Sequence, residues 1–201
     1  MIVKQTKKEG WKEVRLGDLF EIITSDAKTQ YLKEDGAYIV VDMGSISSNG
    51  NLIENKRTDY NNDFLEMNDL IMPKDDIGGG KIIGKVAIIS EENKYILGDH
   101  VYCLRNKTLN SSAFIKHCIN SHRINKSLKS KANGTSQLGL NKKDLIKQTI
   151  FLPSKERQVV IVNLLNSYSK ELEFFRVFTE KYKIQKQGLM QKLLTGKWRV
   201  Q

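Results

Sequence analysis

Ten positions near the end of the chain follow an unbroken spacing of four and three residues, and eight of them are apolar. This is the heptad seam of a coiled coil, in which one face of a long helix packs against a partner helix. We expect the helix to begin at a Ser154 cap, with Glu156 in its first turn, and to end near Leu194. The ten positions are Ile161, Leu165, Tyr168, Leu172, Phe175, Thr179, Tyr182, Lys186, Leu189 and Leu193.

A helix that spans these positions would be roughly 50 Å long at ~1.5 Å per residue, far longer than an ordinary globular helix. Its apolar seam needs a partner, and we expect that partner to be another helix of an assembly. A helix that folds back on its own small domain is the alternative. Thr179 and Lys186 mark the places where the seam is weak.

The preceding residues carry a different pattern, which predicts an α+β fold: an irregular β-rich domain with short helices, followed by the long helix. Residues 111–128 place apolar side chains at helical spacing and predict one amphipathic helix. A last strand at 149–152 ends at Pro153, so we expect a first domain at residues 1–153 and the helix at 154–201. Short apolar runs between Gly, Asn and Asp clusters predict further strands at 38–41, 70–72, 85–89, 95–97 and 101–104.

The charge balance indicates a polyanionic partner. Lys and Arg number 33 against 23 Asp and Glu, a formal net charge of +10. Such a charge attracts nucleic acid through its long-range field and the release of counterions. Lysine-rich chains also use these residues simply to solvate a surface, so charge alone leaves both interpretations open.

Targeting signals are not visible in this sequence. No stretch reaches the ~20 apolar residues of a membrane span, and the first ten residues lack the apolar core of a signal peptide. We therefore expect a cytoplasmic protein without a membrane partner. In that compartment Cys103 and Cys118 should remain reduced, as small core residues.

Two short motifs point weakly to enzyme chemistry. Residues 79–85 have the glycine and lysine spacing of a phosphate-binding loop, but Val86 stands where that motif needs Ser or Thr, and a strand follows where it needs a helix. His117, Cys118 and His122 lie close together, yet their spacing matches no strong zinc pattern. We expect neither a nucleotide nor a metal here, and we read the glycines at 78–80 as a flexible turn.

Catalytic residues are not expected in this chain. The sequence holds no recognisable nucleophile arrangement, and it lacks the Asn-Pro-Pro-Tyr type motif with which adenine methyltransferases hold a flipped base. We predict a protein that is not an enzyme and has no cofactor of its own.

Four segments, in order, resemble the specificity subunits of type I restriction-modification systems. Residues 10–22 (GWKEVRLGDLFEI) look like the opening of a target recognition domain, and 68–72 (NDLIM) with 82–85 (IIGK) are similar to its middle element. Residues 150–153 (IFLP) with Glu156, Gln158 and Ile161 resemble the entry into the conserved helix, and 185–197 (QKQGLMQKLLTGK) look like its end. The sequence departs from the family in its single Pro153, in Arg157 and in its length.

This resemblance implies half of a specificity subunit, because intact members carry two recognition domains and two such helices. The half would dimerise through the seam and hold two identical DNA readers in opposite orientations. The dimer should then recognise an interrupted palindrome in double-stranded DNA, with the helix setting the gap. The resemblance also implies a DNA methyltransferase partner, which supplies S-adenosylmethionine, and a restriction and translocation subunit.

The resemblance transfers no individual DNA contact, so loop placement alone motivates the candidate residues. We expect a basic β-rich domain to dock its loops on the duplex. The candidates for phosphate contacts are Lys74, Lys81, Lys85, Arg123 and Lys126. The candidates for base contacts are Ser45, Asn49, Ser136 and Gln137.

Two functions from other classes remain as alternatives. One is a basic coiled-coil assembly protein, which would show no preference for duplex DNA. The other is an enzyme that binds a nucleotide or a metal near residues 78–85 or 118–122, and nucleotide or zinc would then stabilise it against heat.

Overall fold

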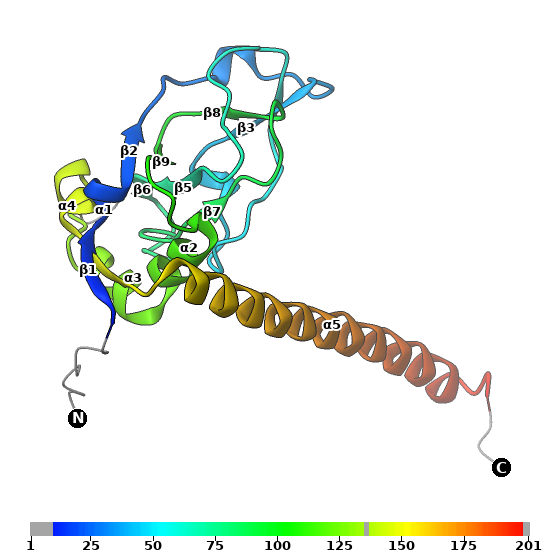
Figure 1. Cartoon of the computed structure of the whole chain (residues 1–201). Helices are drawn as coiled ribbons and strands as arrows, with labels where there is room; N and C mark the ends of the chain where they lie inside the picture. The colour runs from blue at the N-terminus through cyan, green and yellow to red at the C-terminus, as the bar shows by residue number, and fades with distance from the viewer. Residues whose placement is uncertain (1–9, 135–136, 199–201) are drawn as a thin grey trace. The chain divides into compact units, whose positions relative to one another are not determined.

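A computed structural model describes residues 10–134 and 137–198 of the chain. The chain divides into two compact units, Met1–Val159 and Val160–Gln201, and Figure 1 labels most of their elements. The elements, in order, are β1 (Lys12–Arg15), α1 (Leu16–Leu19), β2 (Phe20–Ile23), the 3-10 turn Thr29–Tyr31, β3 (Tyr38–Val41), the 3-10 turn Met43–Ser45, β4 (Arg57–Thr58), β5 (Leu70–Pro73), β6 (Asp75–Asp76), β7 (Ala87–Ile88), β8 (Tyr95–Leu97), β9 (Val101–Asn106), α2 (Ser112–Asn120), α3 (His122–Lys129), β10 (Leu138–Gly139), α4 (Lys142–Lys147), β11 (Thr149–Leu152) and α5 (Lys155–Leu194). The predicted α+β class is confirmed.

Two small sheets form the centre of the first unit. One has the strand order β2-β9-β5-β7 and is antiparallel throughout. The other has the order β4-β3-β8, in which β3 and β8 run parallel. Two strand pairs lie outside these sheets, β1 with β11 and β6 with β10.

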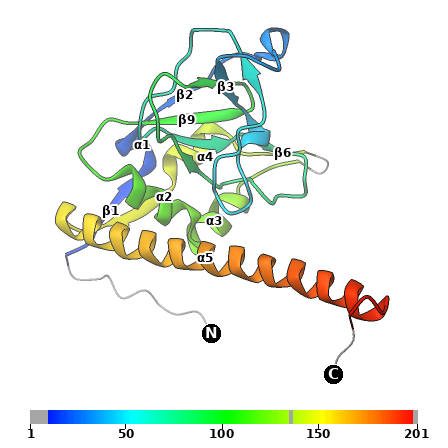
Figure 2. The same ribbon diagram turned by 90° about the vertical axis from the view of Figure 1, so that its right-hand side faces the viewer.

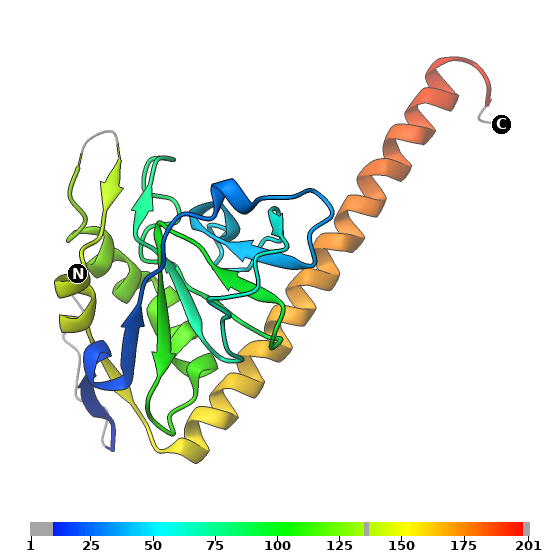
Figure 3. The same ribbon diagram turned by 90° about the horizontal axis from the view of Figure 1, so that it is seen from above.

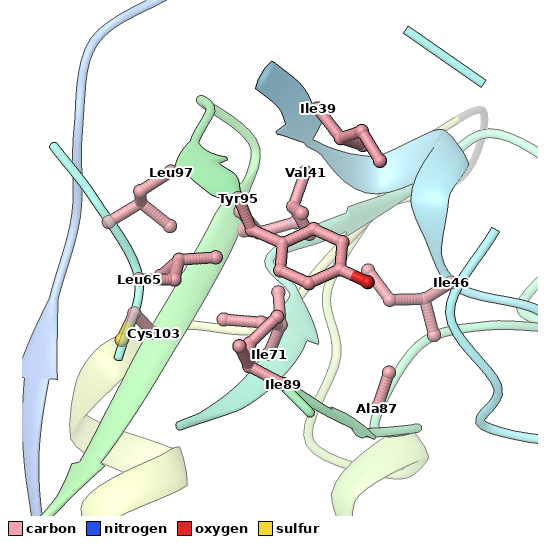
Figure 4. Packing of buried hydrophobic residues seen from close by; sticks show 11 residues of the cluster. Ile39, Val41, Ile46, Leu65, Ile71, Ala87, Ile89, Tyr95, Leu97 and Cys103 are labelled. Carbon is pink, nitrogen blue, oxygen red and sulfur yellow. The ribbon is translucent and has the colours of Figure 1, made fainter. Parts of the chain in front are cut away.

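The hydrophobic core fills the space between the two sheets (Figure 4). Ile39 and Tyr95 enter it from the three-stranded sheet, and Ile71 and Cys103 enter it from the four-stranded sheet. The hydroxyl of Tyr95 donates a 2.7 Å hydrogen bond to Glu54, so the ring can be buried without an unpaired polar group. The β-rich prediction for this part of the chain is confirmed.

The expected single helix at 111–128 is wrong, because two helices, α2 and α3, occupy this segment and lie next to each other (Figure 2). Ser121 separates them with a non-helical ψ of 146°. Its hydroxyl donates to the carbonyl of Cys118 over 2.6 Å and caps the end of α2. The chain therefore turns at Ser121 while both helices keep their apolar faces in the core.

Strands β1 and β11 bring the start and the end of the first unit together. They pair antiparallel from Lys12 opposite Leu152 to Arg15 opposite Thr149. Beside them α1 packs on α4 so closely that a β-carbon at Gly17 would lie 2.9 Å from Cβ of Ile146. Helix α5 follows directly after β11, and Ser154 accepts a hydrogen bond from the backbone nitrogen of Arg157, as expected of its cap.

Candidate nucleic-acid interface

The positive charge of the chain is concentrated in its helical segments. Residues 107–147, which form α2, α3, β10 and α4, hold nine Lys and Arg against one acid, Asp144. Residues 1–106, which contain both central sheets, hold 14 Lys and Arg against 18 acids. The expected basic surface is thus a property of the α2–α4 segment, because the β-rich part is itself acidic.

The cations of residues 107–147 are not neutralised by acids. None forms a salt bridge within the described ranges 10–134 and 137–198. The β-rich part differs, since five of its cations pair with carboxylates. These five are Lys28, Lys33, Lys56, Lys94 and Arg105. Unpaired cations keep their full field for a polyanion, whereas paired ones largely cancel.

Helices α2 and α3 are anchored on the segment at residues 83–86. The side chain of Asn120, at the end of α2, accepts from the backbone nitrogen of Val86 over 2.9 Å and donates to its carbonyl oxygen over 2.8 Å. Asn125 of α3 donates from Nδ2 to the carbonyl oxygen of Ile83 over 3.2 Å. These bonds fix the basic helices beside residues 77–86, the glycine-containing loop between β6 and β7, which we call the glycine loop.

The turn that carries Asn49 packs on the same asparagine. A β-carbon at Gly50 would lie 2.4 Å from Nδ2 of Asn120, and φ at Gly50 is +74°, so only glycine fits well here. Asn49 is exposed beside it. The structure therefore brings Asn49 near the loop that holds Lys85, although 36 positions separate the two residues in the sequence.

Strands β6 and β10 bring two further loops together. They pair antiparallel, with Asp76 opposite Leu138, so the loop after β6 and the loop before β10 leave the pair at the same end. Figure 3 shows this pair at the left edge, with β10 in yellow-green beside β6 in turquoise. Gln137 is exposed in the second loop, next to the glycine loop that carries Lys81.

A buried carboxylate holds the glycine loop. Asp76 is 2% exposed, and its oxygens accept hydrogen bonds from the backbone nitrogens of Gly78 (2.6 Å), Ile82 (2.7 Å) and Ile83 (3.1 Å). Gly80 is buried beside Leu138. The loop is therefore tied at both ends, which differs from the flexible turn expected from its three glycines.

Lys85 lies in an environment that disfavours its charge. Burial lowers the pKa of Lys85, and the charge of nearby Lys129 lowers it further. The Nζ of Lys85 donates to the carbonyl oxygen of Asn120 over 3.3 Å, at the carboxyl end of α2. Two cations held close together without an acid between them form a place where an anion would be stabilised.

The candidate contact residues differ in their access to solvent. Lys81, Arg123 and Lys126 are exposed, whereas Lys74 and Lys85 are half-buried. Ser45 is 0% exposed. Its hydroxyl accepts a hydrogen bond from Asp42 N as part of a capping box and donates one to Val40 O. It has no surface to offer to DNA in this structure. Ser136 lies outside the described residues.

Sequence reasoning missed three residues of this surface. Lys129 and Lys131 add to the same basic segment, and Asp76 organises the glycine loop. The near absence of acids between residues 107 and 147 was the signal that could have found the two lysines. No local pattern marks Asp76, because its role depends on backbone groups two to seven positions away.

The seam side chains of α5 are solvent-accessible along the helix. Tyr168, Leu172, Phe175 and Tyr182 are each more than half exposed. The hydroxyl of Thr179 donates a 2.7 Å hydrogen bond to the carbonyl oxygen of Phe175, one turn earlier in the same helix. An apolar row of this length in water favours association with another helix.

Side chains that could hold a metal ion do not cluster in the described part of the chain. Within residues 10–134 and 137–198, no three His, Cys, Asp or Glu side chains gather in a way that could hold a metal ion. Cys103 and Cys118 carry free thiols. The described helices also include none that is long and apolar enough to cross a membrane.

Comparison with known families decides the assignment. Residues 8–176 match the model of the type I restriction modification DNA specificity domain, Methylase_S. The chain belongs to this family. Specificity domains are in general the DNA-recognising and non-catalytic part of type I systems. No curated protein sequence matched the chain.

Solved structures share the fold of this specificity domain. The S subunit from M. genitalium superposes with a TM-score of 0.64 at 18% identity over 94% of this chain and 47% of its own. A chain from a study of complex assembly in the type I R-M system gives 0.72 at 15% identity over 95% and 46%. The HsdS subunit from Thermoanaerobacter tengcongensis gives 0.64 at 16% identity over 96% and 46%. The specificity domain described here thus spans about half the length of each of these chains.

Proposed function

We propose that this specificity domain reads one half of a bipartite DNA site and directs a DNA adenine methyltransferase to it. The observation that carries the proposal is the unneutralised basic segment 107–147, anchored on the loop at 83–86. Membership of the DNA specificity family supports the same assignment. S-adenosylmethionine would bind to the methyltransferase partner, and a restriction and translocation subunit would join the same complex.

Backbone and base contacts would come from different parts of this surface. Exposed Lys81, Arg123 and Lys126 would contact phosphates and fix the position of the domain on the duplex. Half-buried Lys85, next to Lys129, would hold a single phosphate. Asn49 and Gln137 carry amides that can both donate to and accept from base edges in the major groove.

The long helix would pair two recognition domains. A second copy of the chain is the partner that fits best, because a twofold axis pairs the same apolar row with itself. Two readers in opposite orientations would recognise an interrupted palindrome, and the length of α5 would set the gap between its halves. Pairing with a different half-subunit would give an asymmetric bipartite site.

The test is the salt dependence of DNA binding by the complex of this chain with a methyltransferase subunit from the same genome. The double variant Lys81→Gln with Lys126→Gln removes two unpaired cations from the proposed surface. The slope of log affinity against log salt should fall by about 1.8, since each phosphate contact contributes about 0.9.

The matched control removes the same charge elsewhere. Lys33→Gln with Lys56→Gln also deletes two lysines, but both are paired with carboxylates in the β-rich part. This double variant should keep the wild-type slope. If the slope fell by the same amount in both double variants, only net charge would matter, and the proposed surface would be contradicted.

A further inference from the structure

An apolar side chain stands at the tip of the glycine loop. Ile77 is 65% exposed, and Gly78 and Gly79 beside it are also exposed. A β-carbon at Gly79 would meet no atom within 4 Å, so open space surrounds the tip. An isoleucine in this position contributes little to the core, so its side chain is available to a partner.

The loop that presents Ile77 is held in place. The carboxylate of Asp76, the residue before it, binds three backbone nitrogens of the same loop, and β6 is paired with β10. A β-carbon at Gly80 would lie 3.0 Å from Cδ1 of Leu138, which shows how closely the loop packs on β10. An apolar group on a pre-formed loop loses little conformational freedom when it binds a partner.

The same tip belongs to the proposed DNA surface. Lys81 is exposed four residues further along the loop, and Gln137 is exposed in the loop that leaves β10 at the same end. Because exposed Lys81 on the same loop attracts a polyanion and takes part in no salt bridge within the described residues, Ile77 would be brought against the duplex whenever this loop binds it. The glycines beside it would let the backbone approach the DNA closely.

The base edges of B-DNA offer one apolar group, the 5-methyl of thymine in the major groove. Insertion of Ile77 between stacked bases is the other possible contact, but unstacking costs about as much as a single buried isoleucine recovers. Contact with a methyl group needs no distortion of the duplex. We propose that Ile77 reads a thymine methyl in the half-site. This inference rests on the proposed function.

The first experiment determines the methylation motif in cells. The chain and its methyltransferase subunit are expressed in a host without adenine methylation, and N6-methyladenine is mapped by sequencing. For Ile77→Ser we expect the motif to relax at one A·T position while every other position is kept. Met67→Ser is the matched control, because Met67 is a 52% exposed loop residue of the β-rich part, outside both the glycine loop and the basic segment 107–147, and its motif should be unchanged.

The second experiment removes the methyl group from the DNA. At the relaxed position, thymine is replaced by uracil in a duplex that contains the motif. Binding by the wild-type complex should weaken about fourfold, the change expected for one buried methyl group. The Ile77→Ser complex should bind both duplexes equally, because its contact with the methyl is already lost.

The outcomes separate this inference from the proposed function. A wild-type complex that yields no motif would overturn the proposed function itself. A wild-type motif that Ile77→Ser leaves intact would overturn only the role of Ile77. A third outcome is that the Ile77→Ser complex binds all sequences more weakly, while replacement of thymine by uracil does not change binding by the wild-type complex. This outcome would indicate that Ile77 inserts between bases, and it would also overturn the methyl contact. The thermal midpoint of Ile77→Ser should equal that of wild type, which separates loss of reading from loss of folding.

Discussion

The side-chain oxygen of Gln158, in the first turn of α5, accepts a 2.9 Å hydrogen bond from the backbone nitrogen of Ser111, the cap of α2. Gln158 is 1% exposed, and its Nε2 donates to the side chain of Asn110 over 2.9 Å and to the carbonyl of Pro153 over 3.1 Å. One buried amide therefore joins the start of the long helix to the start of the basic helical segment.

Replacement of Gln158 by Ala should destabilise the chain. The variant leaves the Ser111 nitrogen and the Asn110 side chain without their partner, and an unsatisfied buried polar group costs about 1–3 kcal/mol. Urea denaturation of the purified chain measures the loss. Arg157→Ala changes the exposed neighbouring side chain and should leave the curve almost unchanged. If the two variants unfolded at the same urea concentration, Gln158 would not have this role.

Replacement of Asp76 by Ala should loosen the glycine loop. The variant deprives three backbone nitrogens of their acceptor, so we expect a loss of about 1–3 kcal/mol in unfolding free energy. The amides of Gly78, Ile82 and Ile83 should also exchange faster with solvent, as hydrogen-exchange NMR can detect. Asp59→Ala is the control, since that carboxylate accepts a hydrogen bond from only one backbone nitrogen, that of Ala37, at an exposed site. Unchanged exchange in Asp76→Ala would show that the loop is held by other contacts.

The thiols should react slowly in the folded chain. Burial raises the pKa of Cys118 to about 12 and also raises that of Cys103. Since an ordinary thiol has a pKa near 8.5, the reactive thiolate of Cys118 should be roughly two thousandfold scarcer at pH 8. Labelling with a disulfide reagent should be slow in buffer and rapid in urea. Cys103 is buried and Cys118 is half-buried, and rapid labelling of both in the native chain would contradict their raised pKa values.

The same shifts predict a loss of stability in alkali. The unfolded chain releases its thiol protons near pH 8.5, whereas folded Cys118 keeps its proton up to about pH 12. The folded state therefore binds more protons in this window, and the unfolding free energy should fall as pH rises above about 8.5. Cys118→Ala should lose less stability than wild type between pH 8 and pH 10. Identical pH profiles would exclude this contribution.

Two neighbouring phenylalanines of α5 test the heptad seam. Phe175 lies on the seam and is 63% exposed, while Phe174 lies off it and is 60% exposed. If the seam pairs two chains, wild type should have a mass of about 46 kDa by light scattering, twice that of one 23.0 kDa chain. Phe175→Asp should shift this mass towards one chain, and Phe174→Asp should shift it less. A monomeric wild type would contradict pairing through α5.

Much of the fold could be predicted from patterns that are local in the sequence. The segments at 38–41, 70–72 and 95–97 form strands, and the seam lies on one continuous helix that begins after Ser154. The break at Ser121 could not be predicted in this way. Asn120, directly before the break, binds Val86 across 34 positions of sequence, and helical spacing on either side hides such a tertiary contact.

The candidate site was harder to predict, because exposure depends on tertiary contacts. Ser45 and Asn49 look alike in a polar stretch, yet Ser45 is buried as part of a capping box and Asn49 is exposed on a turn. The net charge of +10 indicated a polyanion but not where the charge lies. That the sheets are acidic and the α2–α4 segment basic became informative only once the fold had separated them.

The pairing of β1 with β11 also bears on how such a domain can change. Lys12 and Leu152 lie opposite each other, so everything between them leaves from and returns to one short strand pair. A different segment that ends in the same two strands and keeps the partners of Gln158 would attach to the same helix in the same way. Under the proposed function, exchange of one contiguous stretch of gene would then change the DNA specificity while the long helix stays the same.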